Sequence, residues 1–220
     1  MRKLYKLYSS IFIQPRVRKR MQGSSIYKWK DIKLFLPPGV FHPGYFHSTH
    51  YLLQHALRQK LPNTKVLELG AGNGLISIAL AKRGALVTAS DINKTALAAL
   101  NDNARANGVS VETIYSDLFG ALTGRTFDLI VINPPFYPQD ARNDLERAWF
   151  AGIDYAYFSR LFAGLFLFMQ KDTQVCMVLS EDCSTAHIED LAQIAGLTME
   201  VVEKKRILWE WNYIYHIKLS

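Results

Sequence analysis

The sequence has little cysteine, which excludes the small secreted domains that disulfides hold together. Its two cysteines, Cys176 and Cys183, have no C-x-x-C spacing. Histidines are concentrated before the first predicted strand: His42, His47, His50 and His55. They form neither an HExxH motif nor any Cys/His ligand spacing typical of zinc. We therefore predict reduced cysteines, no metal site, and histidines that line a pocket or lie on the surface.

Long apolar runs are also absent. No run reaches the length of about 18 residues that a membrane-spanning helix needs, and "SSIFIQP" is too short for a secretory signal. Internal repeats and low-complexity linkers are missing as well. With 49% hydrophobic and 20% charged residues in 220 positions, the chain is typical of one globular α/β domain with a short appendage. We expect no membrane contact and a cytoplasmic protein.

Acidic residues are nearly missing from the first 33 positions. Ten Lys and Arg residues stand there against Asp31 alone, a balance of +9, whereas the sixteen basic and eighteen acidic residues that follow leave −2. This asymmetry predicts a basic N-terminal arm over residues 1–25, which is the best candidate for a disordered segment, and one domain over residues 26–220. The arm either contacts a polyanion such as RNA or a ribosome, or it is a solvated terminus.

From residue 48 onward, helical and short apolar segments alternate, which predicts parallel βαβ units. Ser48 or Thr49, Asn93 and Ser184 stand where helix N-caps are expected. The nearly continuous apolar run at 127–132 suits a strand covered on both faces. Strands are predicted at 65–69, 85–90, 109–115, 127–132, 173–180, 198–203 and 211–219, and helices at 48–61, 76–83, 93–108, 155–168 and 184–196.

A glycine-rich turn follows the first of these strands. "LGAGNG" places Gly70, Gly72 and Gly74 where the strand turns into a helix, and glycine there lets the backbone approach a ligand closely. Dinucleotide folds use G-x-G-x-x-G, with a pyrophosphate at the helix N-terminus. The G-x-G-x-G spacing found here predicts a nucleotide-like cofactor without pyrophosphate and disfavours an NAD-dependent oxidoreductase.

Acidic residues accompany the glycine turn. Asp91 ends the second strand, where it can accept two hydrogen bonds from ribose hydroxyls. Asp117 ends the third strand and could meet an adenine amino group. Glu68 lies inside the first strand, where its buried charge would be costly unless it faces polar groups near the loop. Together with the glycines, these carboxylates indicate a nucleoside-bearing cofactor.

The fourth strand ends in "NPPFYP", a stiff loop at the edge of the sheet where ligands bind in such folds. Proline fixes its own φ and pushes the preceding residue out of the helical region. The side-chain oxygen of Asn133 and the carbonyl of Pro134 can then hold both hydrogens of a planar NH₂ group. Phe136 offers a flat face for stacking, and Pro135 and Tyr137 are candidate substrate contacts.

The glycine turn and the carboxylates resemble the class I S-adenosylmethionine (SAM) methyltransferases over residues 48–220. The resemblance implies a Rossmann-like α/β fold, with a seven-stranded sheet, helices on both faces and an antiparallel last strand. It also implies SAM as cofactor. By this resemblance, residues 68–74, including Glu68 and Ala71, hold the methionine half, Asp91 the ribose, Ile92 the adenine face, and Asp117 with Leu118 the adenine edge.

The Asn133 tetrad resembles the (N/D)PP(Y/F/W) signature of amino-group methyltransferases. "SDINKTALAALNDNARANG" and "ERAWFAGIDYAYFSRLF" are similar to stretches of the HemK-like group with the small methyltransferase domain. "PGVFHPGYFHST" resembles the segment that closes over the cofactor in these enzymes. Two positions depart from the pattern: Phe136 replaces the usual Tyr of the glutamine enzymes, and His47 replaces an acidic residue. Ribosomal-RNA guanine-N2 enzymes commonly carry NPPF.

These observations predict an N-methyltransferase whose catalytic residues are Asn133, Pro134 and Phe136. Its substrate is expected to be protein glutamine, as in a release factor; the alternatives are an adenine-N6 or guanine-N2 amine of RNA or DNA and, less favoured, a small molecule. A rival of another class is a non-catalytic SAM- or RNA-binding module. Such a module has no need of two converging acceptors, so the intact tetrad favours an enzyme.

Overall fold

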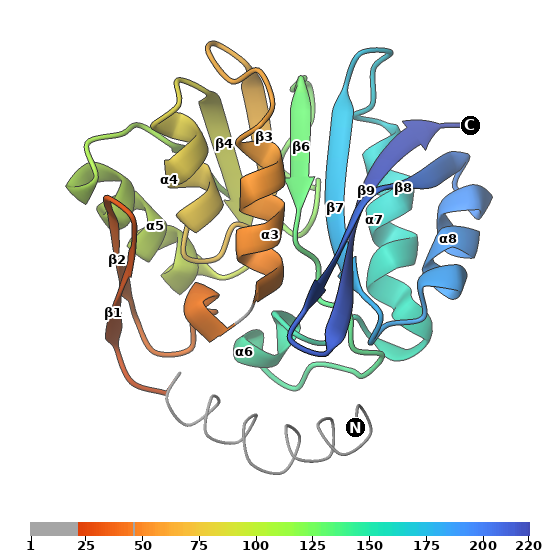
Figure 1. The fold of residues 1–220 in the computed structure, drawn as a ribbon, viewed down its shortest axis with the longest axis horizontal. Helices are drawn as coiled ribbons and strands as arrows, with labels where there is room; N and C mark the ends of the chain where they lie inside the picture. The colour runs from red at the N-terminus through yellow and green to blue at the C-terminus, as the bar shows by residue number, and fades with distance from the viewer. Residues whose placement is uncertain (1–21, 46) are drawn as a thin grey trace.

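The computed structural model describes residues 22–45 and 47–220 (Figure 1). Residues 1–21 of the predicted basic arm lie outside the described residues, so the arm stays a prediction. None of the helices in the described ranges combines the length and the apolar composition that crossing a membrane requires.

A seven-stranded sheet forms the centre of the molecule, with the strand order β5-β4-β3-β6-β7-β9-β8. The five strands from β5 to β7 run parallel, whereas β9 runs antiparallel to both β7 and β8. The predicted α/β fold with an antiparallel last strand is therefore confirmed. The bounds are β3 Lys65–Leu69, β4 Leu86–Asp91, β5 Glu112–Tyr115, β6 Leu129–Ile132, β7 Gln174–Ser180, β8 Leu197–Ile207 and β9 Glu210–Leu219.

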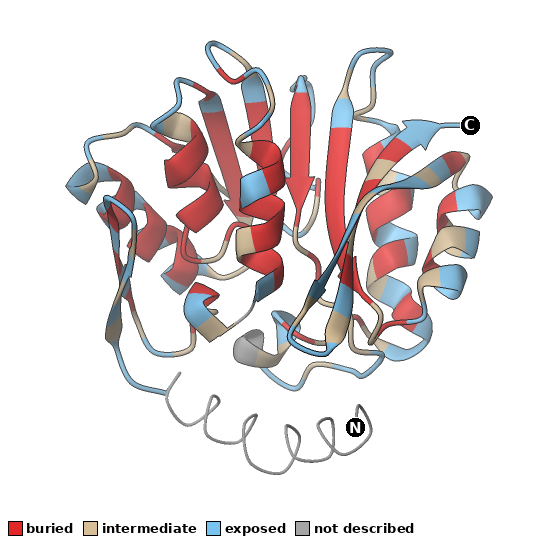
Figure 2. Ribbon diagram, viewed as in Figure 1, coloured by how far each residue is buried: buried red, intermediate tan, exposed pale blue. Residues whose placement is uncertain are grey.

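Helices cover both faces of the sheet, α3, α4 and α5 on one face and α7 and α8 on the other (Figure 1). Successive residues of a strand point to opposite faces, so Leu129 and Val131 of β6 enter one core and Ile130 and Ile132 the other. The central strands β3, β4, β6 and β7 are buried between the helices, whereas the edge strands β5 and β8 are mostly not (Figure 2). The bounds are α3 His47–Ala56, α4 Leu75–Ala81, α5 Lys94–Ala106, α6 Asp144–Arg147, α7 Ala156–Phe166 and α8 Thr185–Ile194, with 3-10 turns η2 Pro43–Tyr45 and η3 Ile153–Tyr155.

An N-terminal antiparallel hairpin, absent from the sequence prediction, packs beside α5. Its strands are β1 Ser25–Trp29 and β2 Ile32–Leu36. Alternate residues of β2 are buried, and the backbone between them is paired by α5. The amide of Asn103 bonds to the N–H and C=O of Phe35, and Asn107, one turn later, bonds to those of Lys33. Two helix side chains thus take the place of a neighbouring strand.

Several local predictions were wrong. Helix α3 begins at His47, so Ser48 and Thr49 lie within it rather than capping it. Ser184 does stand at the N-cap position of α8, but its side chain makes no capping hydrogen bond. The "KKRI" stretch belongs to β8 instead of a connection, because charged side chains are tolerated on an edge strand. Asn93 is confirmed as the cap of α5, where it accepts hydrogen bonds from the N–H groups of residues 95 and 96.

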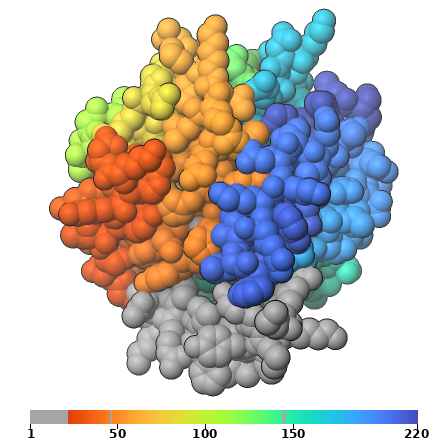
Figure 3. Space-filling model, in the orientation of Figure 1, coloured from red at the N-terminus to blue at the C-terminus, as the bar shows by residue number. Residues whose placement is uncertain are grey.

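Hairpin β8–β9 and helix α3 meet on the face viewed in Figure 3, where the blue surface of the hairpin adjoins the orange surface of the helix. The red surface beside α3 belongs to β1 and β2. The lysines at 28, 30 and 33, which contribute to the basic N-terminal stretch, therefore belong to a folded hairpin.

Candidate active site

A cavity of about 550 Å³ lies at the carboxyl ends of β3, β4 and β6. This volume is in the range of small-molecule and cofactor sites. Every residue predicted from the sequence to bind cofactor or substrate, or to act in catalysis, lines this cavity except Gly74. The predicted residues other than Gly74 therefore lie together around one cavity, and their roles stay predictions.

The glycine turn divides into two parts with different roles. Gly70 and Gly72 have φ angles of +75° and +52°, and a Cβ added at either would meet no atom within 4 Å, so both face open space. Gly74 has a φ of +84°, and its Cβ would lie 2.5 Å from Cγ of Leu100. Gly74 thus lets the start of α4 pack against α5, whereas the first two glycines leave room for a ligand.

Glu68 lies beneath the glycine turn and supports the start of α4. Its Oε2 accepts hydrogen bonds from the backbone N–H of Ser77, at 2.7 Å, and from the Ser77 hydroxyl. Burial raises the pKa of Glu68 to about 8, against the opposing effect of the two bonds from Ser77. The sequence analysis required polar partners for this buried carboxyl near the loop. Ser77 provides them.

Asp91 is fixed by the backbone on both sides of it. Its Oδ2 accepts the N–H of Gly72 at 2.7 Å, and its Oδ1 accepts the N–H of Asn93 at 2.8 Å. Each carboxylate oxygen has more than one lone pair, so a carboxylate that is held by backbone N–H groups can also accept hydroxyl groups. Asp91 therefore shapes the glycine turn as well as lining the cavity.

Helix α7 supplies side chains that the sequence analysis missed. Arg160 Nη2 donates to Asp117 Oδ2 at 2.6 Å, and both residues line the cavity. Tyr157 lines it too, and burial, with additional effects of Asp91 and Asp117, raises the pKa of its hydroxyl well above the ordinary range. That hydroxyl stays protonated and can donate. Tyr157 and Arg160 stand at helical spacing in "AYFSR", but this spacing points to the site only once α7 is known to lie against the loop after β5 that carries Asp117.

The loop after β6 is held in place by main-chain hydrogen bonds. The N–H groups of Phe136 and Tyr137 donate to the carbonyl of Trp149 at 3.2 and 3.0 Å, and Ala151 N–H donates to the carbonyl of Tyr137 at 2.8 Å. The stiffness predicted from the two prolines is therefore reinforced by a second segment, the "WFA" of residues 149–151. Both segments line the cavity.

The side chain of Asn133 is oriented by Thr49 of α3. Asn133 Nδ2 donates to Thr49 Oγ1 at 3.1 Å, and Thr49 is buried. Among the described residues, neither Asn133 Oδ1 nor the carbonyl oxygen of Pro134 has a hydrogen-bond partner. Two acceptors of one loop are thus left for a ligand in the cavity.

The segment before α3 forms another wall of the cavity. Residues 39–41 line it, the carbonyl of Phe41 accepts a bond from Asn73 Nδ2 at 2.8 Å, and the Phe41 ring contacts the Trp149 ring edge-on at 6.3 Å. This is the stretch predicted to close over a cofactor; closure itself stays a prediction.

The histidine prediction holds only in part. His47 is exposed, and His50 Nε2 is 2.6 Å from the hydroxyl of Tyr27. His55, however, is buried between α3 and the sheet, away from the cavity. It neither lines the pocket nor lies on the surface, because the last turn of α3 turns it toward β9.

The charges of the cavity limit what it can hold. Asp91 and Asp117 present carboxylates, and the Gly72 N–H that a dinucleotide fold would offer to a pyrophosphate is bonded to Asp91. That N–H is therefore engaged within the protein instead of facing a pyrophosphate. A ligand with hydroxyl and amino groups and a positive centre fits the same residues, and the cavity has open space at Gly70 and Gly72 to receive it.

Comparisons with known proteins agree with this arrangement. A model of the methyltransferase small domain family matches residues 31–152. The chain is 42% identical over 114 residues to a Methanocaldococcus jannaschii protein provisionally named as a protein N5-glutamine methyltransferase, covering 51% of this chain and 55% of that protein. It is 33% identical over 124 residues to the release factor glutamine methyltransferase of Lactococcus lactis, covering 55% and 45%.

A solved structure shows the same fold. The 16S rRNA N2 G1207 methyltransferase of Thermus thermophilus, in complex with AdoMet and guanosine, matches with a TM-score of 0.61 at 20% identity, covering 90% of this chain and 50% of that chain. The fold is therefore that of the Rossmann-like methyltransferases. The chain spans about half the length of the curated relatives that it matches.

Proposed function

This chain belongs to the methyltransferase small domain family, and from that premise we propose that it transfers the methyl group of SAM to the nitrogen of a planar NH₂ group. The main candidate for this group is the side-chain amide of a protein glutamine. The observation that carries the proposal is Asn133, fixed by Thr49 at 3.1 Å on a loop that lines the same cavity as the glycine turn.

The cavity residues fit SAM as cofactor. Asp91 would accept hydrogen bonds from the ribose hydroxyls, and Gly70 and Gly72 would let the backbone approach the methionine half. Ile92 would pack on the adenine face. Asp117 with Leu118 would lie at the adenine edge, where Asp117 would keep its ion pair with Arg160 or exchange it for the amino group.

SAM supplies an electrophilic methyl group carried on a positively charged sulfur. The nitrogen of an amide or base is a poor nucleophile because its lone pair is delocalised. Asn133 Oδ1 and the carbonyl of Pro134 would accept its two hydrogens and so direct the lone pair toward the methyl carbon. Phe136 would support the flat group by stacking. As the N–CH₃ bond forms, the S–CH₃ bond breaks and one nitrogen proton leaves to solvent.

The substrate assignment is supported by relatives named for protein glutamine methylation. A second candidate is the exocyclic amino group of an RNA base. It is favoured by Phe136 in the tetrad, by the basic N-terminal stretch and by the likeness to an rRNA methyltransferase. Both groups are planar NH₂ donors, and the same two acceptors serve either one.

Transfer of tritiated methyl from SAM tests the proposal and separates the substrates. The full chain is incubated with RNA, with ribosomes and with a lysate that contains release factors, and each product is digested with nuclease or protease. Protease-sensitive label is expected, and nuclease-sensitive label would favour the second candidate. Asn133→Ala should remove the label, whereas Asn101→Ala, on an exposed position of α5, should keep it. If the chain bound SAM but transferred no methyl group, the protein would be a SAM-binding module and not an enzyme.

A further inference from the structure

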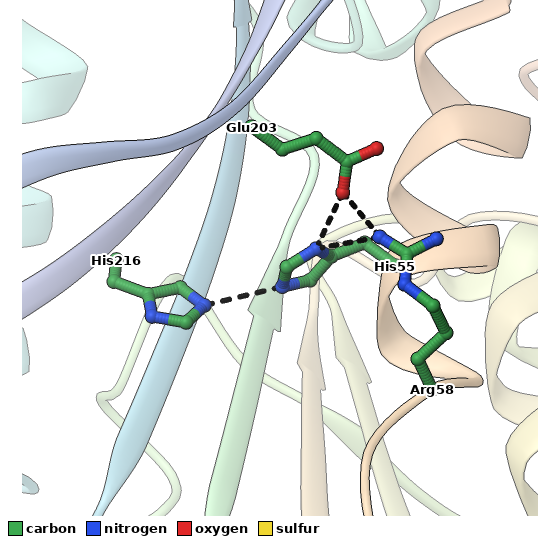
Figure 4. A network of polar contacts seen from close by, with 4 residues as sticks. All are labelled: His55, Arg58, Glu203 and His216. Carbon is green, nitrogen blue, oxygen red and sulfur yellow. Dashed lines mark hydrogen bonds and ion pairs between the residues drawn. The ribbon is translucent and has the colours of Figure 1, made fainter.

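A cluster of metal-ligating side chains lies between α3 and the β7–β9 part of the sheet; Figure 4 shows its two histidines. It consists of His55 from α3, Cys176 from β7 and His216 from β9. The Nε2 atoms of the two histidines are 3.1 Å apart, and the ligand atoms of all three residues lie within 4.8 Å of one another. None of the three lines the active-site cavity.

The sheet brings the cysteine and one histidine together. Cys176 and His216 are direct partners in the antiparallel pairing of β7 and β9, so their side chains leave the sheet on the same face. Helix α3 packs on that face and brings His55 to them. His55 and Cys176 are buried and His216 is half-buried. The three residues are far apart in sequence, so no sequence motif identifies them as a group. For this reason the sequence predicted no metal site.

Glu203 of β8 adds the outer contact that metal-bound histidines usually have. Its Oε2 lies 3.1 Å from Nδ1 of His55 and also pairs with Arg58, which lies just beyond the end of α3 (Figure 4). A histidine ligand commonly donates its other ring N–H to a carboxylate, which fixes the tautomer and the ring orientation. Arg58 Nη2 also lies 3.2 Å from this Nδ1. In the tautomer that the Glu203 carboxylate favours, with the proton on Nδ1, the lone pair of His55 Nε2 points toward the other two ligands.

We propose that His55, Cys176 and His216 bind a zinc-class divalent cation through Nε2, Sγ and Nε2, with water in a fourth position. Zn–N bonds of about 2.0–2.1 Å and a Zn–S bond of about 2.3 Å in a tetrahedron require N···N and N···S separations of about 3.4 and 3.6 Å. The histidine nitrogens meet this distance within a few tenths of an ångström. The cysteine sulfur needs a side-chain shift of about 1 Å at most.

Binding is chemically balanced and sterically accessible. The thiol of Cys176 releases its proton to solvent, and the thiolate becomes the sulfur ligand. Both histidines bind as neutral imidazoles. An ion can enter beside the half-buried His216 and the Glu203–Arg58 pair, whose side chains are 33% and 55% exposed. The bound cation would join the last turn of α3 to β7 and β9.

Cobalt titration of the full chain, after treatment with a chelator and dialysis, tests the site. One equivalent of Co²⁺ is expected to bind with a thiolate-to-cobalt charge-transfer band, and Zn²⁺ should displace it. Cys176→Ser should abolish the band. Cys183→Ser should keep it, because Cys183 is the other buried free cysteine and packs in the opposite core.

Thermal unfolding measures metal binding without relying on the thiolate-to-cobalt band. Zn²⁺ should raise the Tm of the wild type and of His187→Gln, an exposed control, but should not raise that of His216→Gln. Glu203→Ala should weaken Zn²⁺ affinity by about 10- to 100-fold at unchanged stoichiometry. Should Cys176→Ser fail to fold, His216→Gln serves in the cobalt titration as well.

Two results would overturn the proposal. The first is a wild-type titration without a charge-transfer band, which would leave a hydrogen bond between two neutral imidazoles. The second is a band that persists in Cys176→Ser or His216→Gln, which would place the bound metal elsewhere.

Discussion

Replacing Thr49 by valine tests how the active site orients its amide. Thr49 Oγ1 accepts the only hydrogen bond that the Asn133 side chain makes to a described residue, at 3.1 Å. Valine keeps the shape of the buried threonine but removes the acceptor. The amide of Asn133 then loses its fixed orientation, while its oxygen remains available to a substrate. Thr49→Val should therefore slow methyl transfer without abolishing it.

The size of the effect follows from the single bond that is lost. A hydrogen bond of this kind contributes about 0.5–1.5 kcal/mol, so the rate should fall by about 2- to 12-fold at about 1.4 kcal/mol per factor of ten. Asn133→Ala removes a group that contacts the reacting nitrogen, and the expected loss is about 10²- to 10³-fold. Thr49→Ser retains a hydroxyl and should recover most of the rate.

Single-turnover transfer at saturating SAM, on the substrate that the labelling experiment identifies, measures these rates. SAM affinity, measured by calorimetry, should stay near that of the wild type in each variant. In the double variant, Thr49→Val should add almost nothing to Asn133→Ala, because Thr49 acts through that amide. Losses that multiply would show that Thr49 acts on its own, and a wild-type rate in Asn133→Ala would refute the catalytic role of the loop.

Three further perturbations test the cofactor half of the site. Asp91→Ala should weaken SAM binding by about 1.5–3 kcal/mol, as for lost bonds to a charged group; unchanged affinity by calorimetry would remove Asp91 from the site. Gly74→Ala should lower the free energy of unfolding by about 1–3 kcal/mol in denaturant titration, because its Cβ would meet Leu100 at 2.5 Å; in the double variant with Leu100→Ala the total loss should be smaller than the sum of the two single losses, because the clash is gone. Burial raises the pKa of Glu68 from 4.5 to about 8, so folding favours the protonated form and stability should decrease as the pH rises through this interval. Glu68→Gln keeps an acceptor for Ser77 and should flatten the decrease; equal pH profiles would contradict the assigned cause.

The sequence predicted those parts of the protein that local rules determine. The apolar run of β6 requires burial on both faces, the glycine turn requires φ angles that other residues avoid, and the prolines after Asn133 stiffen that loop. Each signal lies within about ten neighbouring residues. The parallel direction of the central strands followed from the alternation of helices and strands, and the antiparallel last strand from the family resemblance.

Contacts between distant segments were not predictable in the same way. Thr49 and Asn133 meet because α3 crosses the end of β6, and nothing in "STHYLLQ" marks that threonine as a partner. Arg160 approaches Asp117 only after α7 is placed. The β1–β2 hairpin does carry a local signal, because apolar and other residues alternate between buried and exposed positions in "IKLFL".

Helix α3 connects the active site with the histidine–cysteine cluster. Thr49 lies in its first turn and His55 in its last, about 9 Å apart along the axis at 1.5 Å per residue. A helix is stiff over this length, so a change in how His55 is seated against β7 and β9 reaches Thr49 as a rigid-body shift. The glycine turn and Asp91 belong to β3 and β4 and would not share that shift. Zn²⁺ at the cluster should consequently act on the orientation of Asn133 and change the single-turnover rate of methyl transfer; a rate that Zn²⁺ leaves unchanged would contradict this coupling.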